Sequence, residues 1–303
     1  MSALSDAESH VRRAPGRNRI RAARSARAGV IQVVLVSISL LFLVPIIWMV
    51  SSSLKSNSQI FVFPPDILPN PAQWDNYPQA LTYIQYGTFF LNSVITSLAA
   101  AIGTVVSCVP AAYAFAILKW PRRNVVFGLV LTTIMLPFPV VMLPQYLIYR
   151  DLGWLGSLLP LTVPPFLGSF ITPYFGSALA IFLLRQFMLG LPRDIVDSAR
   201  VDGAGDWTLL WKIIVPMSKP VLITVLLFTF LSAWTAFIAP LIFLTQGDSW
   251  TLSLGLQQYQ TLHFTAFNYL MAASVIFCIP VLVLFIVAQR YFVQGISLTG
   301  VKG

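Results

Sequence analysis

Six long apolar stretches alternate with polar segments along this chain. Each is about twenty residues long or longer, the length of helix that crosses the hydrocarbon core of a bilayer. They lie near residues 30–50, 89–118, 124–148, 158–184, 218–244 and 269–292. The pattern predicts an all-α membrane protein with six transmembrane helices.

Composition and charge agree with this interpretation. Of 303 residues, 57% are hydrophobic and only 10% are charged, whereas soluble domains carry roughly 25% charged residues. Seventeen of the nineteen Lys and Arg residues fall in alternate segments between the predicted spans. Because basic residues favour the cytoplasmic side, both chain ends are predicted to be cytoplasmic. The net charge of +9 therefore reflects membrane topology, and we expect no nucleic-acid partner.

The chain divides into an N-terminal tail, residues 1–29, and a membrane domain, residues 30–303. The tail holds seven arginines, and no A-x-A cleavage site follows the first apolar stretch, so we expect that stretch to remain as an anchor. Two segments between spans are long: an outer segment, residues 51–88, predicted to be extracytoplasmic, and a cytoplasmic segment, residues 185–219.

The predicted spans lack the acidic side chains that many ion-coupled transport proteins use. All ten acidic residues lie outside them, which disfavours an ion-coupled secondary carrier, although ion sites made of backbone carbonyls keep that alternative open. Two cysteines, two histidines and no phosphate-binding G-x-x-x-x-G-K-[ST] loop indicate neither a metal site nor a bound cofactor nor an enzyme. If a nucleotide drives this protein, another chain must bind it.

The cytoplasmic segment contains "RDIVDSARVDGAGDWTLLWKIIVPM", residues 193–217. Pro192 suits the first turn of a helix, and Gly203 can end that helix in the left-handed conformation. Asp206 can then cap a second helix that runs to Pro216. The sequence predicts a helix, a tight turn and another helix.

In the second helix a stripe at helical spacing is expected to face the base of the membrane domain. It comprises Trp207, Leu210, Trp211 and Ile214. The turn itself has small side chains, through which another protein could approach closely. The alternative is a solvated loop with a helix pair that packs under the bundle and docks nothing.

A path for solute can be sought among polar and aromatic residues of the spans. Since no charge lies there, a neutral polar solute is expected. The candidates are Asn92 and Tyr113 in the second span, Gln145 in the third, and Ser232, Trp234 and Thr235 in the fifth. Each also has a purely structural interpretation, because such side chains commonly bond helix backbone, anchor at interfaces or bridge helices.

The cytoplasmic segment resembles the EAA loop of ABC-transporter permeases, with the pattern E-A-A-x-x-x-G-x9-I-x-L-P. The matching residues, without a gap, are Asp197, Ser198, Ala199, Gly203, Ile213, Val215 and Pro216. "DGA" at Asp202, Gly203 and Ala204 is also common in the family. Asp197 and Ser198 stand where the pattern has Glu and Ala. We call residues 185–219 the coupling loop.

Further pieces are similar to carbohydrate-importer permeases of the type of the maltose permease G subunit. They are "FVFPPDILPNPAQWDNYPQAL", "LNSVITS", "AAYAFA", "MLPFPVVMLPQYLIYRDLGWLGSLLP", "IFLLRQFMLGLPRDIVDSARVDGA" and "QRYFVQGISLTGVKG". Together they cover nearly everything from about residue 30 to the end. Thr235 follows Trp234 where relatives often carry Asn.

The resemblance implies a type I ABC importer fold with six transmembrane helices in the cell membrane. It implies a second permease, two ATPase subunits that bind ATP and Mg²⁺, and an extracytoplasmic solute-binding protein. Asp197 to Ala204 would form a coupling helix seated in the ATPase. The expected cargo is a sugar or related polyol, with a glycerol phosphate or another small polar solute as the alternative.

Overall fold

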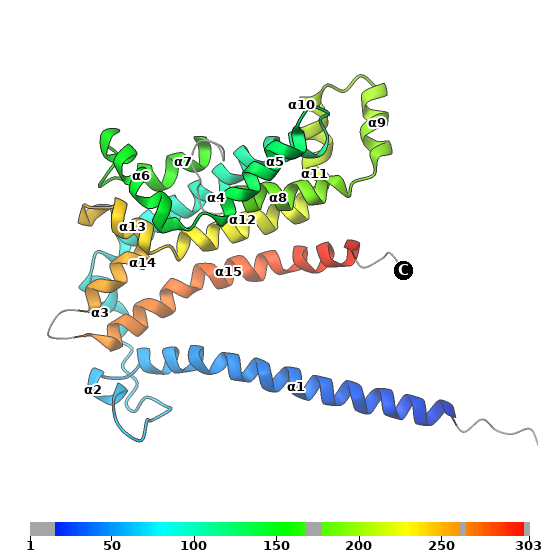
Figure 1. The fold of residues 1–303 in the computed structure, drawn as a ribbon. Helices are drawn as coiled ribbons and strands as arrows, with labels where there is room; N and C mark the ends of the chain where they lie inside the picture. The colour runs from blue at the N-terminus through cyan, green and yellow to red at the C-terminus, as the bar shows by residue number, and fades with distance from the viewer. Residues whose placement is uncertain (1–15, 168–176, 261–264, 300–303) are drawn as a thin grey trace, which may run out of the picture.

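The structure is a computed structural model that describes residues 16–167, 177–260 and 265–299. Three long helices dominate it: α1 (Gly16–Ser53), α4 (Tyr86–Ala116) and α15 (Phe267–Thr299) (Figure 1). The first of these begins inside the predicted tail, whose residues 1–15 lie outside the described residues.

Shorter helices complete the chain. The outer segment contains α2 (Asn57–Ile60) and α3 (Asn76–Tyr83). The others are α5 (Arg123–Thr132), η1 (Thr133–Met135), α6 (Phe138–Asp151), α7 (Leu159–Leu167), α8 (Ser177–Leu189), α9 (Arg193–Val201), α10 (Asp206–Thr208), η2 (Leu209–Ile214), α11 (Val215–Met217), α12 (Lys219–Trp234), α13 (Ile238–Phe243), η3 (Gly247–Ser249), α14 (Leu252–Gly255) and η4 (Leu256–Tyr259).

Only part of the predicted span pattern takes the form of single unbroken helices. Three described helices are long and apolar enough to cross a membrane alone, at Ala28–Ser53, Tyr86–Ala116 and Phe267–Gln289. Two further spans are possible if each of two bent helix pairs counts as one. The predicted span 158–184 contains α7 and the start of α8, and its residues 168–176 lie outside the described residues. The count of six therefore stays a prediction.

The predicted span 124–148 is broken. Its two halves, residues 123–135 and 138–151, meet at 97°. Pro137 has an extended backbone at the junction, with φ −69° and ψ 142°, and precedes the first residue of α6. The residue before a proline avoids helical geometry, and Leu136 is extended too. By contrast, Pro110 remains inside the continuous helix α4.

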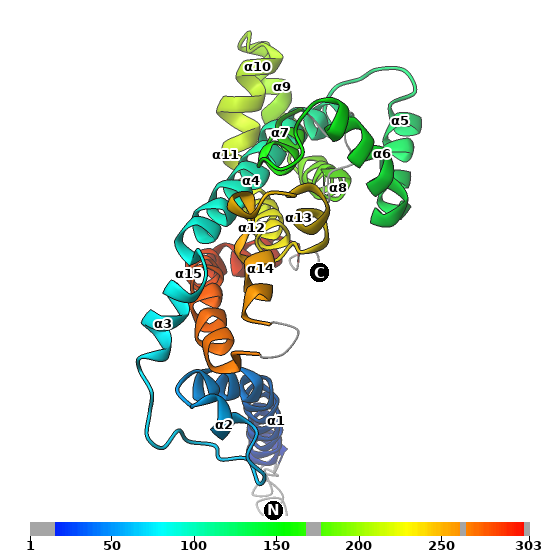
Figure 2. The ribbon, with the colours of Figure 1, turned by 90° about the vertical axis from the view of Figure 1, so that its left-hand side faces the viewer.

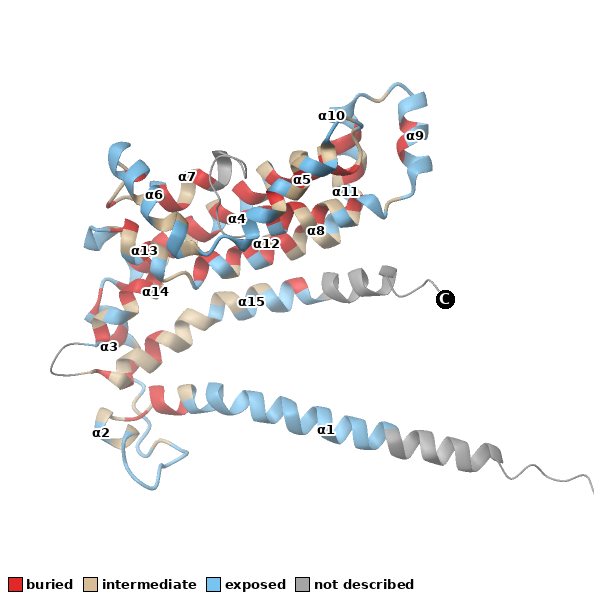
Figure 3. Ribbon diagram, viewed as in Figure 1, coloured by how far each residue is buried: buried red, intermediate tan, exposed pale blue. Residues whose placement is uncertain are grey.

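The packed core lies around α4, with α8 and α12 against it. Its largest cluster includes Tyr113, Ile181, Leu184 and Ile214, all nearly or fully buried. Helix α1 is different, because its apolar side chains are exposed along most of the described length (Figure 3). It lies at the margin next to α15 in both views (Figures 1 and 2). An exposed helix that is apolar on all sides is suited to contact with lipid.

The molecule has two distinct ends. At one end lie α9, α10, the start of α1 and the end of α15 (Figure 1). At the other lie α2, α3 and α14. There the phenol of Tyr259 donates a hydrogen bond to the Ala80 carbonyl oxygen at 2.8 Å. Burial raises the pKa of Tyr259, so the phenol stays protonated and the bond is kept.

Candidate functional site

The turn of the coupling loop has the geometry that its sequence predicts. Helix α9 ends with Gly203 in the left-handed region, at φ +82°. The Gly203 N–H donates to the Arg200 carbonyl at 3.0 Å, and the Ala204 N–H donates to the Ala199 carbonyl at 2.9 Å. This pair of bonds satisfies carbonyls at the end of the helix. The predicted helix, turn and second helix are confirmed.

The residues proposed for docking divide into an exposed and an inward set. Asp197, Ser198, Asp202, Gly203 and Pro216 are exposed. Ala199 is buried and packs in the core cluster with Val196, and Ala204 is half-buried against that cluster. A β-carbon at position 203 would meet nothing within 4 Å. The turn is therefore held by its inner face and open on its outer face.

The predicted apolar stripe of the second helix is partly wrong. Leu210 and Ile214 are buried, but Trp207 is 69% exposed and Trp211 42% exposed. The two indoles stack with ring centroids 6.4 Å apart. The cause is local, because residues Leu209–Ile214 form a π-helix. Hydrogen bonds from i to i+5 place residues five apart on one face, and Leu209 joins Ile214 in the core.

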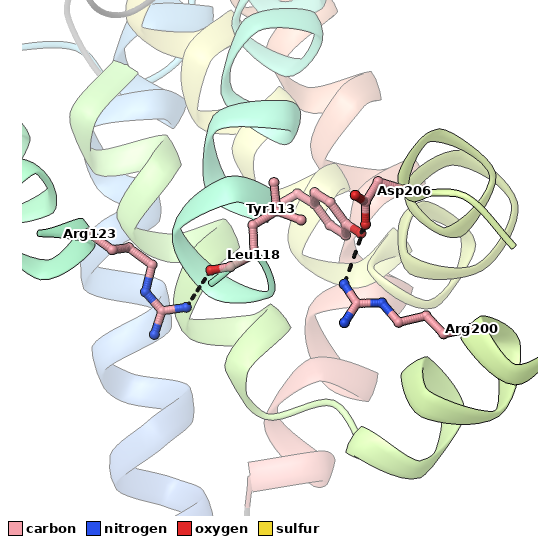
Figure 4. A network of polar contacts seen from close by, with 5 residues as sticks. All are labelled: Tyr113, Leu118, Arg123, Arg200 and Asp206. Atoms are coloured by element: carbon pink, nitrogen blue, oxygen red, sulfur yellow. Dashed lines mark hydrogen bonds and ion pairs between the residues drawn. The ribbon is translucent and has the colours of Figure 1, made fainter. Parts of the chain in front are cut away.

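Asp206 does not cap the second helix as predicted. Gly205 occupies the N-cap position, and no side chain caps the helix there. The Asp206 carboxylate instead accepts a hydrogen bond from the Tyr113 hydroxyl at 2.9 Å. The Arg200 guanidinium lies 3.4 Å from the same oxygen (Figure 4). A partner 93 residues away in the sequence has replaced the local cap.

A cavity of about 360 Å³ lies between α4, α6, α7, α12 and α13. Helix α12 ends at Trp234 and α13 begins at Ile238, so the predicted span 218–244 is interrupted. The interruption borders the cavity, whose walls include Thr96, Phe138, Gln145, Tyr149, Ser232, Ala236, Phe237 and Ile238. Interrupted helices beside a central cavity are typical of transporter binding sites. None of the residues that line it is charged.

The structure brings two of the six predicted path residues to this cavity, Gln145 and Ser232. Trp234 is fully buried, and its indole N–H donates to the Phe277 carbonyl at 3.2 Å. The Thr235 hydroxyl donates to the Leu231 carbonyl at 2.8 Å. Neither of these two residues lines the cavity.

The remaining two candidates lie at opposite ends of α4. The Asn92 amide donates to the carbonyls of Asp248 and Trp250, both at 2.9 Å, so it joins the helix to the chain around η3. Tyr113 lies at the coupling loop. Asn92 therefore has the bridging contacts that its structural interpretation expected. Tyr113, for which that interpretation was an anchor at the membrane interface, is buried and bonds to Asp206 instead.

Sequence reasoning missed other cavity residues, notably Thr96, Tyr149 and Phe237. The Thr96 hydroxyl donates to the Asn92 carbonyl at 2.9 Å, as threonine hydroxyls commonly do in helices. Nothing in the sequence therefore marks Thr96 as a cavity residue. Phe237 belongs to the helix interruption, which no proline or glycine between residues 235 and 237 marks. Within the described residues, no group of three or more His, Cys, Asp or Glu is placed to hold a metal ion.

Apolar helices of membrane-spanning length, an interrupted helix beside a cavity and a helix–turn–helix loop at one end define a polytopic transport protein. Residues 103–298 match the model of the family "Binding-protein-dependent transport system inner membrane component". The chain belongs to this family, and it is a permease of the ABC importer class. The ion-coupled carrier is not supported.

Relatives match most of the chain. It is 32% identical to the arabinooligosaccharides transport system permease protein AraQ of Bacillus subtilis over 88% of this chain and 92% of the relative. It is 30% identical to the diacetylchitobiose uptake system permease protein NgcG of Streptomyces coelicolor, covering 89% and 87%. It is also 30% identical to the sn-glycerol-3-phosphate transport system permease protein UgpE of Yersinia pestis, covering 85% and 91%.

A solved structure has the same fold. It is described as a crystal structure of a bacterial ABC transporter involved in the import of the acidic polysaccharide alginate. The TM-score is 0.75 with 25% sequence identity, and the match covers 89% of this chain and 98% of that one. The predicted class of fold is thereby confirmed.

Proposed function

We propose that this chain is one of two permease subunits of an ATP-driven importer for a neutral sugar or related polyol. A solute-binding protein delivers the cargo from outside, and two separate ATPase subunits hydrolyse ATP with Mg²⁺. The chain itself supplies half of the path and performs no chemistry. The observation that carries the choice of cargo is the uncharged cavity beside the interrupted helix.

Charge and fold together support the proposed orientation. The end that holds the coupling loop also holds the start of α1 and the end of α15 (Figure 1). Most of the chain's basic residues are in the same segments, which favours the cytoplasmic side. Asp197 to Ala204 would then dock on the ATPase, with the exposed turn at Gly203 at the contact. Closure of the ATPase pair would move this element and open the cavity to the other side.

The cavity has the chemistry that a neutral sugar requires. Sugars are bound by aromatic faces together with hydrogen-bonding groups. Gln145 and Ser232 supply an amide and a hydroxyl, while Phe138 and Tyr149 supply rings. The names of two relatives, for arabinooligosaccharides and for diacetylchitobiose, support the same class of cargo.

A glycerol phosphate is the second candidate, because one relative is named for sn-glycerol-3-phosphate transport. A phosphate bound in the membrane domain needs a cation or an array of N–H donors. No Lys or Arg is among the residues that line the cavity. The neutral cargo is therefore the better choice.

The first experiment is to tag the chain, extract it gently from its native membrane and identify what co-purifies. We expect a second permease, an ATPase and a binding protein. The captured binding protein is then titrated with a panel of sugars, polyols and sn-glycerol-3-phosphate, and the assembled transporter is tested for uptake in liposomes with and without ATP.

The control is the same preparation with ATP replaced by a non-hydrolysable analogue. Uptake that needs hydrolysable ATP and the binding protein supports the proposal. A chain that purifies alone and moves solute without ATP would overturn it. Binding of sn-glycerol-3-phosphate and of no sugar would replace the proposed cargo by the second candidate.

A further inference from the structure

One polar contact connects the turn of the coupling loop to α4, the helix at the centre of the packed core. Tyr113, near the end of α4, is 3% exposed, and its hydroxyl donates to Asp206 at 2.9 Å. Arg200 reaches the same carboxylate oxygen at 3.4 Å. Arg200 precedes the turn at Gly203 and Asp206 follows it, so the ion pair joins the two arms of the turn (Figure 4). Tyr113 then attaches that joined turn to α4.

This contact differs in kind from its surroundings. At its first residue the loop has one other such bond, from the Arg185 guanidinium to the Phe115 carbonyl of α4 at 3.2 Å. Residues 193–217 otherwise rest on the core through apolar side chains such as Val196, Leu209 and Ile214. Apolar contacts have no preferred direction and can slide, whereas a hydrogen bond weakens steeply when its angle or length changes. The bond from Tyr113 to Asp206 is therefore a directional point of attachment between the loop and the membrane domain.

Helix α4 extends from this attachment to the cavity. Thr96 on the same helix lines the cavity, seventeen residues before Tyr113 in the sequence. At 1.5 Å per residue the two positions are about 25 Å apart along the helix. Because α4 is continuous from Tyr86 to Ala116, a displacement at Tyr113 is carried toward the wall of the cavity.

We propose that Tyr113, Asp206 and Arg200 are positioning residues that transmit motion of the coupling loop to α4 and so to the cavity. Arg200 keeps the two arms of the turn together, and Asp206 passes their motion to the Tyr113 hydroxyl. This inference rests on the proposed function, in which the exposed turn docks on an ATPase.

The hydroxyl of Tyr113 can be removed with little effect on the fold. A phenylalanine ring would fill the same place in the core cluster. Asp206 is 57% exposed at its side chain, so water can hydrate its carboxylate once the hydroxyl is gone. The Tyr113→Phe variant therefore separates coupling from assembly.

The test compares two tyrosines of α4 in the assembled transporter in liposomes. Tyr113→Phe removes the bond to Asp206. The matched control, Tyr86→Phe, removes a hydrogen bond to the Ala273 carbonyl at the other end of the helix, from a tyrosine that is 4% exposed. Solute imported and ATP hydrolysed are measured together. We expect import per ATP to fall about tenfold in Tyr113→Phe, the loss of one bond to a charged group, and to be unchanged in Tyr86→Phe.

A second variant tests the same contact from its exposed side. Asp206→Ala is expected to lower import per ATP at least as much, and the double variant Tyr113→Phe/Asp206→Ala no further, because both changes break one link. Equal ratios in wild type, Tyr113→Phe and Asp206→Ala, or an equal loss in Tyr86→Phe, would overturn the inference. If the wild-type chain neither binds an ATPase nor imports with ATP, the proposed function itself has failed.

Discussion

Gly255 lies directly against the ring of Phe89. A β-carbon built at position 255 would lie at or within 3.0 Å of three atoms of that ring. Phe89 is 1% exposed on α4, and Gly255 closes α14, so the glycine is what lets the outer end of the chain pack on α4. No left-handed conformation is involved, because the requirement is for space alone.

Gly255→Ala is therefore expected to destabilise the protein by about 1–3 kcal/mol, the usual cost of adding a methyl group to a filled core. The measurement is the thermal unfolding midpoint of the detergent-solubilised transporter. Gly247→Ala serves as the control, since a β-carbon there meets nothing within 4 Å. Equal midpoints for the two variants would contradict the packing found at Phe89.

The turn of the coupling loop offers a second pair of glycines. Gly203→Asp forces a side chain into the left-handed region, at a cost of about 1–2 kcal/mol, and adds charge to the exposed turn. Gly205→Asp adds the same charge at φ −71°, where no strain arises. We expect Gly203→Asp to insert normally but to lose ATPase association and uptake, and Gly205→Asp to keep both in larger part.

The two glycine variants are compared by co-purification of the ATPase and by ATP-dependent uptake, with membrane content of each variant checked by its tag. Normal association and uptake in Gly203→Asp would remove the coupling role from residues 197–204. An equal loss in both variants would assign the effect to charge alone.

The predicted path residues fall into two groups, those that line the cavity and those that do not, and the two groups can be tested against each other. Gln145→Ala and Ser232→Ala each remove a hydrogen-bonding group from the cavity wall, and a lost bond costs about 0.5–1.5 kcal/mol. We expect a several-fold weaker apparent affinity for uptake with unchanged ATPase association. Thr235→Ala, whose hydroxyl bonds its own helix, should leave uptake affinity unchanged. Equal effects at all three positions would show that the cavity is not part of the path that the solute takes.

Local rules predicted the features that depend on neighbouring residues. Gly203 was found because glycine is the residue that ends a helix in the left-handed conformation, and φ +82° bears this out. The apolar lengths of α1, α4 and α15 were likewise visible in the sequence. Each of these features is decided within one continuous stretch of chain.

Of the three features that the sequence did not predict correctly, two depend on contacts between distant parts of the chain and one on a local change of helix type. The sequence predicted a helix cap for Asp206, because only neighbouring residues were considered as its partners. Its actual partner, Tyr113, lies 93 residues earlier. The stripe through Trp207 and Trp211 assumed the spacing of an α-helix, and the π-helix shifted the buried face. The cavity combines α4, α6, α7, α12 and α13, so no single stretch of sequence contains its pattern.

The outer end offers a test of one such distant contact. The Asn76 amide donates to the carbonyls of Ser53 and Lys55 at 2.9 and 2.8 Å, and the Asn268 amide donates to Asn76 at 2.9 Å. Asn76 is 2% exposed. It therefore ties the end of α1 and the start of α15 to α3.

Asn76→Ala leaves two buried carbonyls and one amide without their partner, at an expected cost of about 1–3 kcal/mol. Asn268→Ala should cost less, since it removes one bond. The double variant should cost less than the sum, by about 0.5–3 kcal/mol, because both single changes break the same link. Unfolding midpoints of the solubilised transporter give all three values, with the exposed Asn70→Ala as control. Strict additivity would mean that Asn76 and Asn268 act independently, and would contradict the link between their two amides.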